Sequence, residues 1–304
     1  MSTAFLFAGQ GSQSVGMGKD LAVSCPHCAA LFEHTDDVLR FPLRRALWEG
    51  SADDLRQTAV LQPALLAVEV AQARHLRALG RAPAWLAGHS VGQYSALVVA
   101  ESLPFDDALR LVRERGLLMQ EAVPDGVGAM AAILELDRAE IRKLCRSVPG
   151  VVGIASHNAP GNTVISGDRE AVAEAVGRCR EAGALVVELP VSAPFHTALL
   201  EPMVPPFTAL VEKTSFRDPT VPVIDNVGAR PLTDAASVRR ALVLQVSAPV
   251  LFEESLRYLV ERGVDEFVQC GPGKHVLGFV GRIHSGATLL PFEEAAAGGT
   301  PAPH

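Results

Sequence analysis

Short apolar runs alternate along the chain with longer segments in which apolar side chains recur every three or four positions. The short runs predict buried strands, and the longer segments predict helices with one buried face. The predicted strands lie at 4–8, 83–87, 220–227 and 266–270. The predicted helices lie at 26–40, 63–79 (with Pro63 as the first helical residue), 106–122 and 249–263. This alternation indicates an α/β fold with a parallel sheet.

The segment 125–190 has an order of its own: strand, helix, strand, strand, helix, strand. That order is typical of a ferredoxin-like unit. We therefore predict a small ferredoxin-like subdomain at 125–190, inserted into a large subdomain made of 1–124 and 191–292. The last stretch, 293–304, has small residues and proline and predicts a disordered tail.

Composition places the chain among globular proteins. Of its 304 residues 48% are hydrophobic and 20% are charged, which is enough apolar material for a sizeable core. The net charge of −7 without a long basic run argues against a nucleic-acid partner. No apolar run approaches the ~20 residues that span a bilayer, and the N-terminus lacks a basic signal region. We expect no membrane association and a cytoplasmic location.

The five cysteines include one C-x-x-C, formed by Cys25 and Cys28. Such a pair can be redox-active or half of a zinc site. A structural zinc site needs about four ligands, and no second pair follows at a suitable spacing. The strand that precedes a thioredoxin-type motif is also missing. We expect five free thiols, with a redox or metal role as the minor alternative.

Residues 88–92, "GHSVG", match G-x-S-x-G between a predicted strand and a predicted helix. In that context the turn presents Ser90 as a nucleophile, and the backbone N–H of Val91 at the helix start can stabilise an oxyanion. The alternative is a coincidence of common residues. Two other glycine-rich turns, at 9–14 and 271–275, fail the spacing of phosphate-binding loops, so no nucleotide cofactor is expected. We also expect no metal in the site.

A serine hydroxyl needs a base near neutral pH. His89 is next to Ser90 but would point away from it on a tight turn. His196 lies where the chain returns from the predicted insertion to the large subdomain, so it can reach Ser90 across the cleft. A capping or core role is the alternative for His196.

Arg115 falls inside the apolar stripe of the predicted helix 106–122, whereas Arg110, Arg113 and Glu114 point to its polar side. An inward guanidinium costs several kcal/mol unless it is paired. Either a buried carboxylate of the protein pairs with it, or it holds the carboxylate of a ligand through a bidentate fork. The residues alone leave both possibilities open.

Together, "FAGQGSQSVGMG", "AGHSVGQYSALVVA", "VRERGLLMQEAVPDGVGAMAAIL", "VSAPFHTALLEP" and "QCGPGK" resemble the malonyl-CoA:acyl carrier protein transacylase family from about residue 4 to 290. That family includes free-standing polyketide acyltransferases. The resemblance implies a hydrolase-like α/β subdomain that carries a ferredoxin-like insertion. It implies transfer of malonyl from coenzyme A to the phosphopantetheine thiol of an acyl carrier protein, without a cofactor.

The resemblance also implies roles for single residues. Ser90 is the nucleophile, His196 the base, and Gln245 orients His196 through its backbone carbonyl. The backbone N–H groups of Gln10 and Val91 form the oxyanion hole. The remaining positions, expected at the substrate, are Arg115 for the malonyl carboxylate, Phe195 for selectivity against a methyl branch, and Asn158. Ala8 and Gln93 depart from the frequent proline and glutamate.

Three alternatives share parts of this pattern. A trans-acting polyketide acyltransferase would use another carrier protein or another acyl group. An acyl hydrolase that clears carrier proteins would tend to lack Arg115, and a non-catalytic docking module would not need the serine, histidine and arginine together. We expect a monomer. Candidate basic pairs for docking the acidic carrier are Arg44 with Arg45, Arg239 with Arg240, and Lys274 with Arg282.

Overall fold

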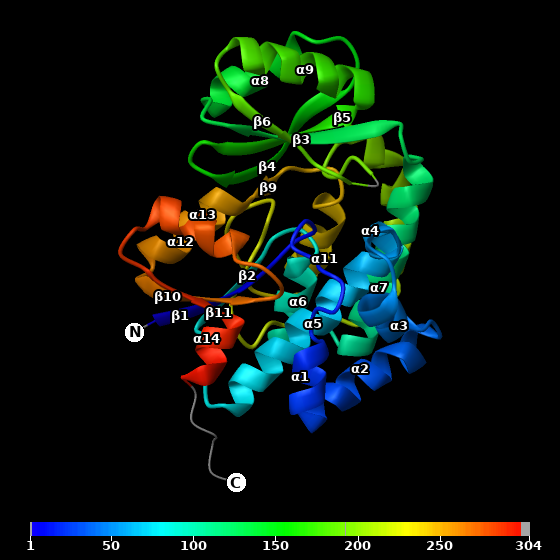
Figure 1. The fold of residues 1–304 in the computed structure, drawn as a ribbon, viewed down its shortest axis with the longest axis vertical. Coiled ribbons are helices and arrows are strands. Elements are labelled where there is room, and N and C mark those ends of the chain that lie inside the picture. Colours follow the sequence, from blue (N-terminus) through cyan, green and yellow to red (C-terminus); the bar gives the residue numbers. More distant parts are fainter. Residues whose placement is uncertain (1, 192, 299–304) are drawn as a thin grey trace.

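A mostly parallel sheet of six strands lies at the centre of the larger part of the molecule, in the lower half of Figure 1. The computed structural model describes residues 2–191 and 193–298. The strand order is β11-β10-β1-β2-β7-β8, and only the pair β7–β8 is antiparallel. The strands are β1 (Ser2–Phe7), β2 (Trp85–Gly88), β7 (Val223–Ile224), β8 (Pro231–Leu232), β10 (Val264–Cys270) and β11 (Thr288–Pro291).

Helices cover both faces of this sheet, which explains why β1 is apolar at successive positions. Phe5 and Phe7 belong to the core on the side of α5 to α7, whereas Ala4 and Leu6 belong to the core on the side of α12 and α13. The helices are α1 (Lys19–Ser24), α2 (Pro26–Leu39), α3 (Leu43–Glu49), α4 (Ala52–Arg56), α5 (Thr58–Ala78), α6 (Gly92–Val99), α7 (Phe105–Ala122), α10 (Val204–Lys213), α11 (Ala235–Leu244), α12 (Phe252–Glu261), α13 (His275–Ile283), α14 (Phe292–Ala297) and the 3₁₀ helix Ala198–Met203.

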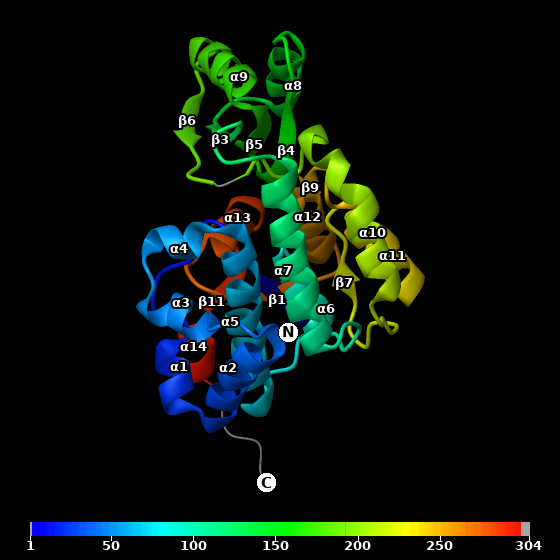
Figure 2. The ribbon, with the colours of Figure 1, turned by 90° about the vertical axis from the view of Figure 1, so that its right-hand side faces the viewer.

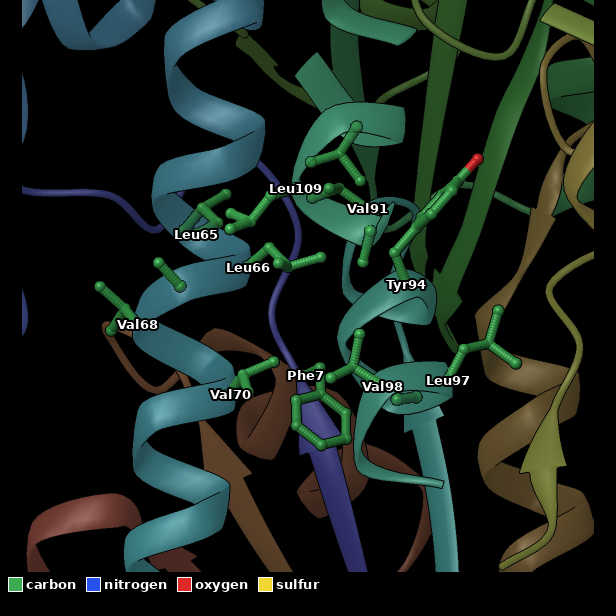
Figure 3. Packing of buried hydrophobic residues seen from close by; sticks show 14 of the residues in the cluster. Phe7, Leu65, Leu66, Val68, Val70, Val91, Tyr94, Leu97, Val98 and Leu109 are labelled. Carbon is green, nitrogen blue, oxygen red and sulfur yellow. The ribbon is translucent and has the colours of Figure 1, made fainter. Parts of the chain in front are cut away.

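The end of β1 is fixed by packing between two helices. Figure 3 shows Phe7 between Val70 of α5 and Val98 of α6. Phe7 and Val70 are fully buried and Val98 is nearly so, and full burial of a side chain of this size stabilises the fold by about 1.5–3 kcal/mol. This packing holds the end of β1 in place. Gln10 lies three residues after the end of β1, and Ser90 lies two residues after the end of β2.

A second sheet forms the upper part of the molecule (Figures 1 and 2), in the order β6-β3-β5-β4-β9. β3, β4, β5 and β6 pair antiparallel and are covered by two helices, in the chain order of a ferredoxin-like unit. β9 is contributed from outside this segment and pairs parallel with β4. The elements are β3 (Gly128–Leu134), α8 (Arg138–Arg146), β4 (Val152–Ala159), β5 (Asn162–Asp168), α9 (Arg169–Glu181), β6 (Leu185–Glu188) and β9 (Val250–Leu251).

The predicted fold class, a parallel α/β subdomain with a ferredoxin-like unit, is confirmed. The predicted start of the second long helix was wrong, because α5 begins at Thr58 and Pro63 lies inside it. Leu61 and Gln62, ahead of the proline, are buried in the core. Their packing keeps the chain helical despite the hydrogen bond that a proline removes. The strand predicted at 220–227 is reduced to Val223–Ile224.

The prediction of disorder from residue 293 was wrong for its first part, where α14 forms. Phe292 and Ala295 are buried against the large core, and Glu293 and Glu294 lie in the first turn, where carboxylates favour a helix. Residues 299–304 of the predicted tail lie outside the described residues. Across the described part of the chain, no helix is both long enough and apolar enough to span a bilayer.

Candidate active site

Ser90 lies on a sharp turn between β2 and α6, with its backbone in the left-handed region (φ 54°). Two glycines make the turn possible: a Cβ on Gly88 would lie 2.0 Å from the carbonyl carbon of Gly92, and a Cβ on Gly92 would lie 2.5 Å from the carbonyl oxygen of Phe7. Asn226 braces the turn, because its Oδ1 accepts the Ser90 N–H (2.8 Å) and its Nδ2 donates to Gly88 O (2.7 Å). The strained turn therefore holds the Ser90 hydroxyl where it can act as a nucleophile.

His196 forms a hydrogen bond with Ser90, with Nε2 2.7 Å from the Oγ atom. Its Nδ1 lies 2.9 Å from the backbone carbonyl oxygen of Gln245. Since a carbonyl only accepts, Nδ1 carries the hydrogen and Nε2 is free to accept the hydroxyl proton. Burial, followed by the charge of Arg115, lowers the pKa of His196 to about 3. His196 is therefore a neutral base at physiological pH.

Arg115 is 1% exposed and extends from α7 toward Ser90. Its Nη1 donates to Gln62 Oε1 (2.9 Å), and its Nη2 donates to Gln245 Oε1 (3.2 Å) and to Ser90 Oγ (3.4 Å). The guanidinium also lies 5.4 Å from the centre of the Tyr94 ring. Among the described residues no carboxylate pairs with it, and its Nε has no partner. The buried cation thus has only neutral partners.

Gln245, at the end of α11, connects the base, the nucleophile and the cation. It is fully buried. Besides the bonds to His196 and Arg115, its Nε2 donates to the carbonyl oxygen of Ser90 (3.1 Å) and to Asn226 Oδ1 (3.0 Å). Gln245 therefore fixes the relative positions of all three groups.

Two backbone donors belong to residues near the serine, because Val91 follows Ser90 in the chain and Gln10 lines the same cavity. In the described part of the chain, neither the N–H of Gln10 nor that of Val91 has a hydrogen-bond acceptor. Gln62 holds the side chain of Gln10 through a bond from Nε2 to Oε1 (3.2 Å). Gln62 thereby links the loop after β1 to Arg115.

A cavity of about 350 Å³ opens above Ser90, between the two sheets. His89 Nε2 lies 3.0 Å from Asn158 Oδ1 and its ring packs on Phe252, so it points away from the serine hydroxyl. The cavity is lined by residues of β3, β4, β5 and α13, of the turns after β1 and β2, and of the segment after β6: Gln10, Gly11, His89, Ser90, Met130, Ala132, Ser156, Asn158, Asn162, Val164, Leu189, Val191, Phe195, His196, His275 and Phe279. Apolar side chains thus form much of the wall around the Ser90 hydroxyl and the His196 imidazole.

The model of the acyl transferase domain matches residues 4–279 of this chain. The chain belongs to the acyl transferase family. The malonyl CoA-acyl carrier protein transacylase of Escherichia coli K12 is 43% identical over 298 residues, which is 97% of this chain and 96% of that protein. The resemblance stated from the motifs is therefore confirmed.

Solved structures of family members agree in fold. The malonyl CoA-acyl carrier protein transacylase from Coxiella burnetii matches with a TM-score of 0.94 at 39% identity, over 97% of this chain and 95% of that chain. A malonyl-transacylase in complex with its type II polyketide synthase acyl carrier protein matches with a TM-score of 0.93 at 39% identity, over 96% of each chain.

In the acyl transferase site the predicted residues other than Val91 lie either in the hydrogen-bond network or on the cavity wall, and Val91 follows Ser90 in the chain. Sequence reasoning missed Asn226 and Gln62. Asn226 follows a short strand and carries no local signal. One feature of the sequence could have indicated the role of Gln62, because it is a polar residue in the apolar run at the start of α5. Its bonds to Gln10 and Arg115 show why it is retained inside.

The three basic pairs differ in their position relative to this acyl transferase cavity. Lys274 and Arg282 flank the stretch of α13 that carries the cavity residues His275 and Phe279. Arg44 pairs with Asp36 (2.9 Å), and Arg239 stacks on Phe216 at 5.3 Å. None of the residues Arg44, Arg45, Arg239 and Arg240 lines the cavity.

Within the described residues, the side chains of the acyl transferase cavity include no cluster of metal-binding geometry. The cluster that does have this geometry joins Cys25, Cys28 and His75, none of which lines the cavity. All five cysteines are free and buried.

Proposed function

We propose that this acyl transferase moves a malonyl group from coenzyme A to the phosphopantetheine thiol of an acyl carrier protein, through an ester on Ser90. One observation supports it above the others: Arg115 is a buried cation 3.4 Å from the nucleophile, and no carboxylate of the described residues pairs with it. A malonyl thioester supplies both the carbonyl for the serine and the carboxylate for the guanidinium.

In the first half-reaction Ser90 Oγ attacks the thioester carbonyl while His196 Nε2 takes the hydroxyl proton. The tetrahedral oxyanion accepts hydrogen bonds from the N–H groups of Gln10 and Val91, for which residues 2–191 and 193–298 offer no other acceptor. The C–S bond then breaks, and His196 returns the proton to the departing thiolate. Malonyl remains as an ester on Ser90, and free coenzyme A leaves.

The second half-reaction runs the same steps in reverse order with a new thiol. His196 takes the proton of the phosphopantetheine thiol, whose sulfur attacks the ester carbonyl. The oxyanion returns to the same N–H pair, and the C–O bond to Ser90 breaks with return of the proton to Oγ. His196 accepts each proton from Ser90 or from a thiol and then returns it, so the proposal requires no cofactor or metal.

Arg115 would hold the free carboxylate of malonyl by a bidentate fork, exchanging its neutral amide partners for a charged one. Phe195 and Asn158 line the cavity beside the acyl site. The Phe195 ring, 7% exposed, restricts the space for a branch next to the carbonyl. A carboxylate clamp also disfavours the alternative of a general acyl hydrolase, which has no use for one.

The carrier protein would approach the cavity mouth along α13, where Lys274 and Arg282 offer positive charge to an acidic partner. Fatty-acid and polyketide carriers present the same thiol, so the chemistry of the site fits either pathway. A relative solved with a polyketide carrier protein supports the second. We place the reaction in the cytoplasm and expect a monomer, which sedimentation analysis can test.

Intact-protein mass spectrometry tests the proposal directly. After exposure to malonyl-CoA the mass should rise by one malonyl group, and addition of a holo acyl carrier protein should remove it while the carrier gains it. Ser90→Ala should show no increment. Release of free malonate instead of transfer would establish a hydrolase and contradict the proposal.

A further inference from the structure

A second group of chemically reactive side chains lies away from the catalytic cavity, at the start of α2. Cys25 is the residue before this helix, Cys28 lies in its first turn, and His75 projects from α5. The two sulfur atoms and one ring nitrogen of His75 all lie within 4.8 Å of one another. Residues far apart in sequence thus converge as three ligands suitable for a soft metal ion.

The local sequence "CPHC" explains the placement of the thiols. Cys25 is extended (φ −129°, ψ 107°), and Pro26 begins the helix, which a missing N–H permits at this position. The backbone N–H of Cys28 points back to Cys25 Sγ at 3.4 Å. This N–H···S contact stabilises negative charge on the sulfur, which a metal-bound thiolate would carry.

The third side chain comes from the neighbouring helix. Cys28 Sγ contacts the carbonyl oxygen of Ala71 at 3.8 Å. His75 follows Ala71 by four residues and therefore lies on the same face of α5. Its ring packs against Phe292 at 6.0 Å, and no hydrogen bond to the ring is found in the described part of the chain. The imidazole is thus held in place with its ligand atoms unused.

The surroundings give access for an ion. Cys25 and Cys28 are 8% and 3% exposed, whereas His75 is half-buried and lines a cavity of about 550 Å³. Asp20 and Glu293 line the same cavity and can offer a carboxylate oxygen. The cluster is therefore closed on the thiol side and open on the imidazole side.

We propose that Cys25, Cys28 and His75 bind one thiophilic divalent ion, Zn²⁺ by ligand chemistry, with the fourth position filled by water or a carboxylate from the cavity. Tetrahedral zinc, with bonds of about 2.3 Å to sulfur and about 2.1 Å to nitrogen, places its ligand atoms about 3.6–3.8 Å apart. The observed limit of 4.8 Å requires an inward movement of about 1 Å or less, within the range of side-chain rotation.

A disulfide between the two cysteines is the competing outcome. It would leave the imidazole without a role, whereas the metal uses all three groups. Metal binding displaces the protons of both thiols, and the affinity should therefore rise with pH.

Titration of the reduced, chelator-treated protein with Co²⁺ tests the site. The expected result is a 1:1 complex with sulfur-to-cobalt charge-transfer bands and the intense visible bands of tetrahedral cobalt, displaced by Zn²⁺. Cys28→Ser should abolish the charge-transfer bands, and His75→Ala should weaken affinity at least tenfold. The buried Cys145→Ser and the exposed neighbour His27→Ala are matched controls and should bind as the wild type does.

Circular dichroism shows whether each variant folds. If Cys28→Ser does not fold, His75→Ala still tests the site, because it keeps both cysteines. Malonyl loading is expected to persist without metal, because none of the three residues lines the catalytic cavity. The proposal is overturned if no sulfur-to-cobalt band appears, if Cys28→Ser binds as tightly as the wild type, or if the isolated protein contains a Cys25–Cys28 disulfide that reduction converts to a form without metal affinity.

Discussion

Nη2 of Arg115 lies 3.4 Å from Oγ of Ser90, deep in a site where no carboxylate from the described part of the chain pairs with the guanidinium. The guanidinium belongs to α7, and the hydroxyl lies on the turn before α6. Their spacing lets one small ligand touch both, with a carbonyl at the hydroxyl and a carboxylate at the cation. This relationship resolves the choice that the sequence left open for Arg115, since no protein carboxylate among the described residues neutralises it.

Arg115→Ala should abolish most malonyl loading while leaving acetyl loading in place. Two hydrogen bonds to a charged group, at about 1.5–3 kcal/mol each, correspond to a loss of roughly 10²–10⁴ in kcat/KM for malonyl-CoA. Competition between malonyl-CoA and acetyl-CoA, read by intact mass, measures the change. Arg110→Ala removes an exposed arginine of the same helix and should load malonyl normally. A loss of both acyl groups in Arg115→Ala would argue for a structural role.

His196 should remain neutral well below the usual pKa of histidine, because burial and the charge of Arg115 lower its pKa to about 3. NMR of the imidazole nitrogens should show the Nδ1–H tautomer at pH 5. In Arg115→Ala the pKa should rise, since one of its causes is gone. A His196 pKa near 6.5 in the wild type would contradict this electrostatic picture.

The same histidine makes stability depend on pH. Between pH 6.5 and 3 the unfolded chain binds a proton at His196 that the folded chain does not. Unfolding free energy should therefore fall on acidification, by at most about 1.4 kcal/mol per pH unit from this group. Urea unfolding of the wild type and of His196→Gln at several pH values measures the difference, and the variant should show the shallower slope.

Gly92→Ala should disrupt the turn that presents Ser90, because the added Cβ would lie 2.5 Å from the carbonyl oxygen of Phe7. We expect loss of activity and a destabilisation of several kcal/mol, comparable to overpacking a rigid core. Gly177→Ala in α9 is the matched control, since no atom lies within 4 Å of its added Cβ. That variant should gain about 0.5–1 kcal/mol. Denaturant unfolding compares the two.

Phe195→Ser should relax the preference for malonyl over methylmalonyl. The wild-type ring lines the acyl cavity beside His196, and exclusion of one methyl group is worth about 1–3 kcal/mol, or roughly 10–200-fold. Loading from an equimolar mixture of the two thioesters measures the ratio. Equal loading of both by the wild type would show that Phe195 is no selectivity element.

The sequence by itself determined the elements and the chemistry carried on them. The apolar runs, the helical stripe around Arg115 and the glycines on either side of Ser90 are local patterns, and local sterics and periodicity fix their structural meaning. The strand and helix order of the small sheet was predictable for the same reason. Pro63 and the start of α14 were misjudged because distant packing, which no local pattern records, decides whether those residues stay helical.

Only the tertiary structure decided which side chains meet. Gln245 joins His196, Arg115 and Ser90, which lie 49 to 155 residues away in the sequence. Asn226 braces a turn to which nothing in its own segment points. Likewise, "CPHC" supplies only the two thiols of the cluster, and the packing of α5 places His75 beside them. A ligand set or catalytic network depends on distances between elements, and these are set by how the two sheets and their helices pack.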